Sequence, residues 1–273
     1  MTLQVIRQGS SGEAVRQWQL LLIGEGFLKE VADGIFGPVT DAATRNYQKA
    51  RGLTADGVVG SKTYAQAINE GMAVVEDEEE FPPRPDLRPL LGTSARQKVF
   101  GKFQFDPAPT PNNKERIKIK GDWGKQNIIT LRINELQGID VYGTPSSGRM
   151  RFHKKAGEQL KGLWAAWGKS DLFKLIKTYE GSFAPRFIRG SKTTLSNHSF
   201  GSAFDINLAW NRLGKIPALA GSEGSVRELV PIANEFGFYW GGHFKSRPDG
   251  MHFEVAKILS KKELESQKEK HGL

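Results

Sequence analysis

The sequence DGIFGPVT at residues 33–40 returns as DGVVGSKT at residues 56–63, so both stretches read D-G-x-x-G-x-x-T. Each copy predicts a glycine-rich turn that leads into a helix. Pro38 suits the first position of a helix, and Ser61 is a good N-cap residue. This repeat, with its copies 23 residues apart, predicts a small helical domain in the N-terminal part of the chain.

The apolar residues around the repeat recur at helical spacing and predict three helices. We expect the first at about residues 12–24, the second at about 38–51 with Gly52 as its stop, and the third at about 62–70. The apolar stripes of these helices are formed by Ala14, Trp18, Leu21, Leu22, Val39, Ala43, Tyr47, Tyr64, Ala67 and Ile68.

This arrangement resembles the small three-helix peptidoglycan-binding module that is common in cell-wall hydrolases. The matching stretches are LQVIRQGSSGEAVRQWQLLL, DGIFGPVTDAATRNYQKARGL and DGVVGSKTY, which span roughly residues 3–70. The resemblance implies that residues 1–73 bind the glycan or the stem peptide of the wall. A generic helical bundle with glycine-capped turns is the alternative.

A linker is expected after this domain, at residues 74–95. It holds the acidic run EDEEE at residues 76–80, followed by FPPRPDLRPLLG with four prolines. Like charges repel one another, and prolines lack a backbone donor and fix φ, so neither a helix nor a central strand suits the segment. Residues 96–273 then form the second domain.

Composition excludes several classes of protein. The chain has 273 residues, of which 38% are hydrophobic and 25% charged, as in an ordinary globular protein. It has no cysteine, which excludes disulfides, thiolate metal sites and a cysteine nucleophile. No apolar run approaches the roughly 20 residues of a membrane span, and the first residues lack the apolar core of a Sec signal peptide.

The charge is uneven along the chain. Residues 1–75 carry no net charge, residues 76–94 carry −4, and the remainder carries +13 of the overall +9. A basic second half suits a polyanionic partner, and the charge alone leaves nucleic acid, an anionic membrane and an anionic cell wall open. We expect no nucleic-acid partner, because no nucleic-acid motif or regular stripe of basic residues accompanies the charge.

The second domain mixes helical and strand patterns irregularly, which predicts an α+β fold. Residues 118–136 alternate like short strands, whereas residues 154–169 and 171–179 have helical spacing. Ser225 is a candidate cap for a further helix that ends near Gly237, with a kink or a delayed start at Pro231.

Two segments of this domain combine histidine and carboxylate residues. In SNHSFGSAFDIN (196–207), a strand would turn Asp205 away from the apolar face, and a turn at Gly201 would bring His198 near it. In DGMHFEV (249–255), His252 shares a strand face with Glu254. Two histidines and one carboxylate form a common catalytic zinc set, and a further carboxylate such as Asp249 suits a general base. The spacing alone does not distinguish a metal site from ordinary hydrogen-bonded histidines, so both interpretations stay open.

The pattern S-x-H-x-x-G-x-A-x-D, followed by W-G-G and D-x-M-H-F-E, resembles the zinc D,D-peptidases of the VanY-like (M15) family and the related L-alanyl–D-glutamate endopeptidase lysins. YEGSFAPRFIRG and GSVRELVPIANEFGFYWGG also match. The resemblance covers most of residues 100–258. It implies zinc (Zn2+) held by His198, Asp205 and His252, with Asp249 as general base and acid. It also implies an arginine that binds the substrate carbonyl, for which Arg186 fits best and Arg189 is the alternative.

Five other polar residues need an interpretation. Many relatives have Asp where this chain has His243, which we expect on the surface, with a substrate contact or a metal contact as alternatives. Glu254 is expected to orient a ligand. Ser196 is expected to shape its loop or bind substrate, and His153 to cap a helix or lie on the substrate side. His271 is expected to be solvated in a charged tail.

The sequence thus predicts two domains: a small all-α three-helix domain, and an α+β zinc peptidase domain with a small, mainly antiparallel sheet. The expected function is a zinc-dependent peptidoglycan peptidase, endolysin-like, that cuts a stem-peptide bond, either L-Ala–D-Glu or a bond containing D-Ala. The alternative is a non-catalytic wall-binding protein with a degenerate peptidase domain. We expect a monomer that acts in the periplasm or cell wall and is released by lysis, through a holin, or by a dedicated export system.

Overall fold

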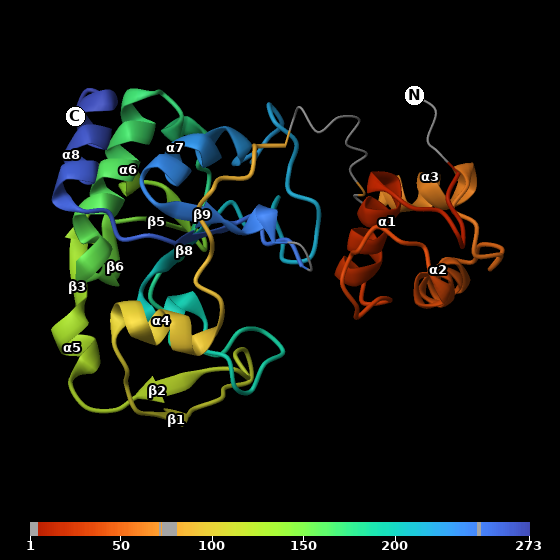
Figure 1. The fold of residues 1–273 in the computed structure, drawn as a ribbon, viewed down its shortest axis with the longest axis horizontal. Helices are drawn as coiled ribbons and strands as arrows, with labels where there is room; N and C mark the ends of the chain where they lie inside the picture. The colour runs from red at the N-terminus through yellow and green to blue at the C-terminus, as the bar shows by residue number, and fades with distance from the viewer. Residues whose placement is uncertain (1–4, 71, 73–80, 245–246) are drawn as a thin grey trace. The chain divides into compact units, whose positions relative to one another are not determined.

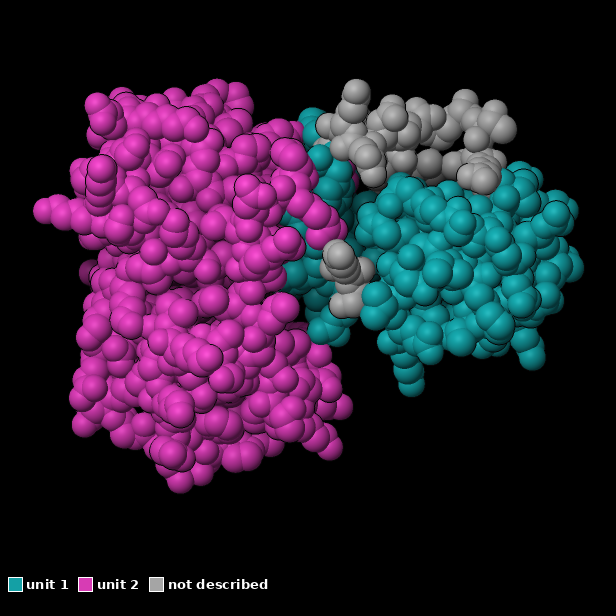
Figure 2. Space-filling model, in the orientation of Figure 1, with its two compact units in different colours: residues 1–81, 209–225, 241–251 teal, residues 82–208, 226–240, 252–273 magenta. Residues whose placement is uncertain are grey.

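A computed structural model of the chain describes residues 5–70, 72, 81–244 and 247–273. It divides into two compact units, which Figure 2 shows in different colours. The described residues of 1–81, with segments 209–225 and 241–251, form the first unit, and residues 82–208, 226–240 and 252–273 form the second. The acidic run expected in the linker, residues 76–80, lies outside the described residues.

Three helices of the first unit confirm the all-α N-terminal domain: α1 (Glu13–Gly24), α2 (Pro38–Ala50) and α3 (Ser61–Asn69) (Figure 1). Trp18 is fully buried between them and donates Nε1–H to Thr44 Oγ1 at 2.9 Å. Two residues of the expected stripes, Val39 and Ile68, are instead 49% and 43% exposed. Around Val39 the reason is local, because Thr40 turns inward and accepts a hydrogen bond from Gln19.

The sequence repeat is a repeat of hydrogen bonds. In the first copy, Gln19 Nε2 donates to Asp33 Oδ1, Ile35 O and Thr40 Oγ1, and Gln19 Oε1 accepts from the backbone N–H of Gly34. In the second copy, Gln48 makes the four equivalent contacts. Its Nε2 donates to Asp56 Oδ1, Val58 O and Thr63 Oγ1, and its Oε1 accepts from Gly57 N–H. Each buried glutamine therefore ties a D-G-x-x-G-x-x-T turn to a neighbouring helix.

The second unit mixes short helices and strands and confirms the α+β class. Its α-helices are α4 (Gly92–Phe100), α5 (Trp123–Asn127), α6 (Gly157–Lys169), α7 (Val230–Glu235) and α8 (Lys261–Lys270). Its strands are β1 (Phe105–Pro107), β2 (Ile117–Ile119), β3 (Ile128–Arg132), β4 (Asp140–Val141), β5 (Thr144–Pro145), β6 (Arg149–His153), β7 (Tyr179–Gly181), β8 (Ala203–Ile206), β9 (Phe238–Trp240) and β10 (His252–Val255).

Short 3-10 turns connect these elements: η2 (Asn134–Leu136), η3 (Lys154–Ala156), η4 (Phe173–Leu175), η5 (Asn197–Phe200), η6 (Arg227–Leu229) and η7 (Gly241–His243), of which η7 belongs to the first unit. None of the helices within the described ranges has both the length and the apolar content needed to cross a bilayer.

One antiparallel sheet with the order β7-β8-β10-β9 forms the centre of the second unit. Phe204 of β8 pairs with Phe253 of β10, and their rings stack with centroids 5.5 Å apart. On this face of the sheet the rings meet Trp164 and Trp167 of α6. The next pair along the two strands is Asp205 with His252, so the apolar pairing fixes the register of the polar pair.

The helix expected at residues 171–179 is wrong, because the segment forms only the turn η4 before it enters the sheet as β7. Asp171 adopts a left-handed φ of 56°, and the side chain of Asn207 replaces helical partners. Asn207 Oδ1 accepts from the N–H groups of Lys177 and Thr178, and its Nδ2 donates to Leu175 O. The expected delay at Pro231 is confirmed, since α7 begins only at Val230.

Candidate metal centre

Backbone features of the second unit position the three predicted ligands. His198 lies in η5, which Ser196 caps by accepting the N–H of His198 at 3.3 Å and which ends at Gly201 with φ 61°. A Cβ at Gly201 would lie 2.8 Å from Ile128 Cδ1, so this tight, left-handed turn favours glycine. The turn leads directly into β8, where Asp205 faces His252 across the strand pair.

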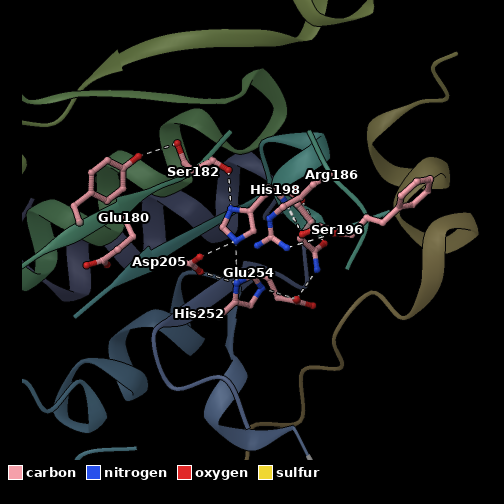
Figure 3. Close-up of polar contacts among 12 residues, drawn as sticks. Glu180, Ser182, Arg186, Ser196, His198, Asp205, His252 and Glu254 are labelled. Atoms are coloured by element: carbon pink, nitrogen blue, oxygen red, sulfur yellow. Dashed lines mark hydrogen bonds and ion pairs between the residues drawn. The ribbon is translucent and has the colours of Figure 1, made fainter. Parts of the chain in front are cut away.

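These three side chains converge, as Figure 3 shows. His198 Nε2 lies 3.1 Å from Asp205 Oδ2, and His252 Nδ1 lies 2.9 Å from Asp205 Oδ1. The two ring nitrogens are 3.2 Å apart. One ligand atom from each residue falls within 4.8 Å of the others, and both histidines are buried.

The other nitrogen of each imidazole fixes where its proton sits. His198 Nδ1 is 2.9 Å from the carbonyl oxygen of Ser182, which only accepts, so this nitrogen carries the proton. His252 Nε2 is 3.0 Å from Glu254 Oε2, so it donates to the carboxylate. In the neutral rings, the nitrogens that face each other and Asp205 are therefore both lone-pair acceptors.

Such a cluster of acceptors fits a metal ion. Two nitrogens and a carboxylate are ligands that zinc prefers, and ligand atoms about 2.0–2.1 Å from one tetrahedral ion lie about 3.3 Å from each other. The observed separation of 3.2 Å between the ring nitrogens agrees with this value. Burial raises the pKa of Asp205. If the histidines carry a positive charge instead, that charge and their hydrogen bonds to the carboxylate outweigh burial and lower the pKa.

Behind His252 lies a further layer of polar contacts that the sequence did not predict. Glu254 Oε2 also accepts from Asn197 Nδ2, and Asn197 Oδ1 accepts from Arg96 Nε at 2.9 Å. Arg96 comes from α4, 101 residues before Asn197. No local pattern marks such a partner, although Asn197 stands beside His198 in sequence.

Arg186 is half-buried and lies next to this loop in the second unit. Its backbone N–H donates to Ser199 Oγ at 2.8 Å, and its carbonyl accepts from Ser196 N–H at 3.0 Å. These bonds join the arginine segment to η5, which carries His198. Arg189 is exposed. The preference for Arg186 over Arg189 as substrate contact stays a prediction.

Asp249 and His243 belong to the first unit. Asp249 is half-buried, and its backbone N–H donates to Gly241 O at 2.9 Å. Its role as general base stays a prediction. The surface position expected for His243 is wrong, because the residue is 1% exposed, with its ring 5.5 Å from that of Phe81.

The other weighed residues have structural contacts. Glu254 makes the bond to His252 that a ligand-orienting role requires. His153 caps η3 by accepting Lys155 N–H at Nδ1, and it is fully buried. His271 is not simply solvated, because α8 brings its Nε2 to 2.7 Å from Glu235 Oε2. Its ring also meets Phe236.

Comparison with known families agrees with both domains. Residues 11–66 match the peptidoglycan binding domain family, and residues 189–255 match the D-alanyl-D-alanine carboxypeptidase family. The second match contains all three converging residues. The N-terminal domain is thus similar to peptidoglycan-binding domains, and part of the second domain is similar to D-alanyl-D-alanine carboxypeptidases.

Individual relatives match over about a quarter of this chain. The zinc D-Ala-D-Ala carboxypeptidase of Streptomyces albus G is 49% identical over 61 residues, which are 22% of this chain and 24% of that protein. The spore cortex-lytic enzyme of Bacillus cereus is 47% identical over 60 residues, 22% of this chain and 23% of the enzyme. The crystal structure of the SleB N-terminal domain has 40% identity and a TM-score of 0.25, covering 26% of this chain and 96% of that domain. This chain spans about a quarter of the length of the two enzymes.

Proposed function

We propose that this protein is a zinc-dependent peptidoglycan peptidase, an endolysin-like cell-wall hydrolase. It would cut a stem-peptide bond, either L-Ala–D-Glu or a bond that contains D-Ala. The observation that carries the proposal is the convergence of His198, Asp205 and His252, whose facing ring nitrogens are both acceptors 3.2 Å apart. Residues 11–66 would hold the enzyme on its insoluble substrate and so raise the local substrate concentration.

In this mechanism, His198 Nε2, Asp205 and His252 Nδ1 would hold the zinc ion. When bound, zinc lowers the pKa of a water molecule and polarises the scissile carbonyl. Asp249 would accept the proton of the attacking water and transfer it to the departing amine. The Arg186 guanidinium would donate hydrogen bonds to the carbonyl oxygen as negative charge develops on it.

The chain's other residues would keep these groups ready for reaction. Ser182 O and Glu254 hold the protons of the two imidazoles away from the metal side. The site of action would be the periplasm or cell wall, reached by lysis, through a holin or by a dedicated export system. We propose a monomer with no nucleic-acid partner.

The test is mass spectrometry of the products released from purified peptidoglycan. Wild-type protein should release fragments whose new ends name the cleaved bond, and EDTA should abolish them. Asp249→Ala should retain zinc but lose turnover, whereas His198→Ala and His252→Ala should lose zinc. Zinc is measured by elemental analysis of the purified variants.

Two results would contradict the proposal in different ways. Full zinc content and activity in either histidine variant would exclude the ligand assignment. If zinc-replete wild-type protein binds the wall but releases no fragments, the chain would be a non-catalytic wall-binding protein.

A further inference from the structure

Arg96 is a buried cation whose contacts need an explanation. It is 5% exposed, and burial lowers the pKa of its guanidinium. Its Nε donates to Asn197 Oδ1 and its Nη1 to Leu195 O at 2.8 Å, so both acceptors are uncharged. A buried charge held only by neutral groups is costly, and a buried apolar side chain would serve packing alone more cheaply.

The negative charge that opposes Arg96 is the carboxylate of Glu254, and Asn197 lies between the two groups. Asn197 accepts from Arg96 at Oδ1 and donates from Nδ2 to Glu254 Oε2. The same Glu254 oxygen accepts Nε2–H of His252 at 3.0 Å. Glu254 and Asn197 are 2% and 3% exposed. Since water is excluded, the orientation of each group in this series depends on the next one.

We propose that Arg96 is a positioning residue for the candidate metal centre. Through Asn197 and Glu254 it holds the His252 ring so that Nε2 keeps the proton and Nδ1 faces Asp205 and His198. The inference rests on the metal-binding part of the proposed function. It gives a role to α4, which lies outside residues 189–255 that match the peptidase family.

The amide of Asn197 explains why an arginine is suited to this place. An asparagine side chain can turn over and exchange its oxygen and nitrogen, and only one orientation presents Nδ2–H to Glu254. The guanidinium is a donor without acceptors, so it selects the orientation in which Oδ1 faces α4. Its second bond, to Leu195 O, fixes the guanidinium to the strand-like segment just before η5.

The first experiment measures zinc affinity by competition with a chromophoric chelator, without any substrate. Arg96→Met should weaken binding about 10- to 100-fold, as is typical when a partner of a metal ligand is removed. Arg96→Lys keeps the charge but loses the paired geometry, and it should cause a smaller loss. If Arg96→Met fails to fold, the lysine variant decides the question alone.

A matched control separates positioning from general stability. Gln159 is also buried in the second unit, where it donates to Phe236 O and Lys257 O and has no contact with the centre. Gln159→Leu should lower the melting temperature of the zinc-free protein while zinc affinity stays within twofold of wild type. An equal loss of affinity in Gln159→Leu would reduce the Arg96 effect to loss of stability and overturn the inference.

A double-mutant cycle tests whether the effect passes through Asn197. Asn197→Leu alone should also weaken zinc binding, and adding Arg96→Met in that background should change affinity by less than twofold. Independent, additive losses would contradict the inference, as would unchanged affinity in Arg96→Met. If wild-type protein itself binds no zinc, the proposed function and the inference both fail. Zinc binding without cleavage removes only the peptidase proposal.

Discussion

The three-helix domain and the central sheet both bury polar side chains behind tight turns, but they use them in opposite ways. Gln19 and Gln48 each place a donor group against acceptors and an acceptor against a backbone N–H. In the second unit, His198 Nε2 of η5 and His252 Nδ1 of β10 face each other at 3.2 Å with Asp205 beside both. In one region each glutamine donor meets an acceptor, whereas in the other the three groups that face one another are acceptors.

This difference distinguishes structural polar residues from those of a binding site. A buried network with every donor matched stabilises the fold, and removing one member leaves its partners unsatisfied. A group of acceptors that converge on one point opposes folding until a cation binds them. The same comparison explains why histidine content alone says little here, since His153 is as buried as His198 yet its contacts are those of a cap.

The largest effects are expected when one buried polar side chain is replaced in each region, Asp205 in the candidate metal centre and Gln48 in the three-helix domain. Asp205→Asn puts an amide donor beside the histidine nitrogens and should lower zinc affinity at least 100-fold, since a neutral amide is a poor zinc ligand. In the zinc-free protein at pH 8, it should leave stability unchanged or raise it by about 1 kcal/mol. Zinc titration and thermal unfolding with a chelator measure the two effects.

The matched change in the three-helix domain is Gln48→Leu. It leaves Gly57 N–H without its acceptor and removes the donor to Asp56, Val58 O and Thr63. We expect the free energy of unfolding of this domain to fall by about 2–4 kcal/mol, with zinc affinity unchanged. A destabilising Asp205→Asn together with a neutral Gln48→Leu would reverse the comparison.

Acid should next separate the three-helix domain from the second unit, because residues 1–73 contain no histidine whereas His153 lies in β6 of the second unit. Burial lowers the pKa of His153 to about 4, against an ordinary value of 6.5. The unfolded chain therefore binds a proton first as pH falls, so stability is complete above pH 6.5 and is lost down to about pH 4. The loss amounts to about 3 kcal/mol at most.

The three-helix domain should respond only at lower pH. The hydrogen bond from the Gln19 side chain lowers the pKa of Asp33, and the hydrogen bond from Val58 N–H lowers the pKa of Asp56. Their stabilising effect is present above the ordinary pKa of aspartate, about 3.9, and is lost below it. Calorimetry of the zinc-free protein across pH 3–8 should resolve the two responses. His153→Gln, which can keep both hydrogen bonds, should reduce the loss of stability between pH 6.5 and pH 4. If the stability profile of this variant is unchanged, the loss comes from other histidines.

The sequence could predict those features whose contacts join residues close together in the chain, and it missed those whose contacts join distant segments. The turns at residues 33–40 and 56–63 and the pairing of His252 with Glu254 rest on neighbours and strand periodicity, so spacing revealed them. The burial of His243 and the role of Asn207 depend on chain segments brought together only by folding. Arg96 illustrates the limit, because its partner lies 101 residues away and its own helix has no unusual pattern.

The smallest expected effect concerns the β4–β5 hairpin, where a local rule is broken. Its two turn residues, Tyr142 and Gly143, have φ values of 50° and 84°, as in a type I′ turn. Tyr142 is 75% exposed and gains one long hydrogen bond, from Oη to Glu180 O at 3.3 Å. Tyr142→Asn gives the Asn-Gly pair that this turn favours and should raise stability by about 0.5 kcal/mol. Chemical denaturation of the zinc-free protein measures the change. A loss of stability would mean that the tyrosine stabilises the hairpin as the glutamines stabilise their turns. The expected gain would mean that Tyr142 lowers the stability of the fold, as we expect of Asp205.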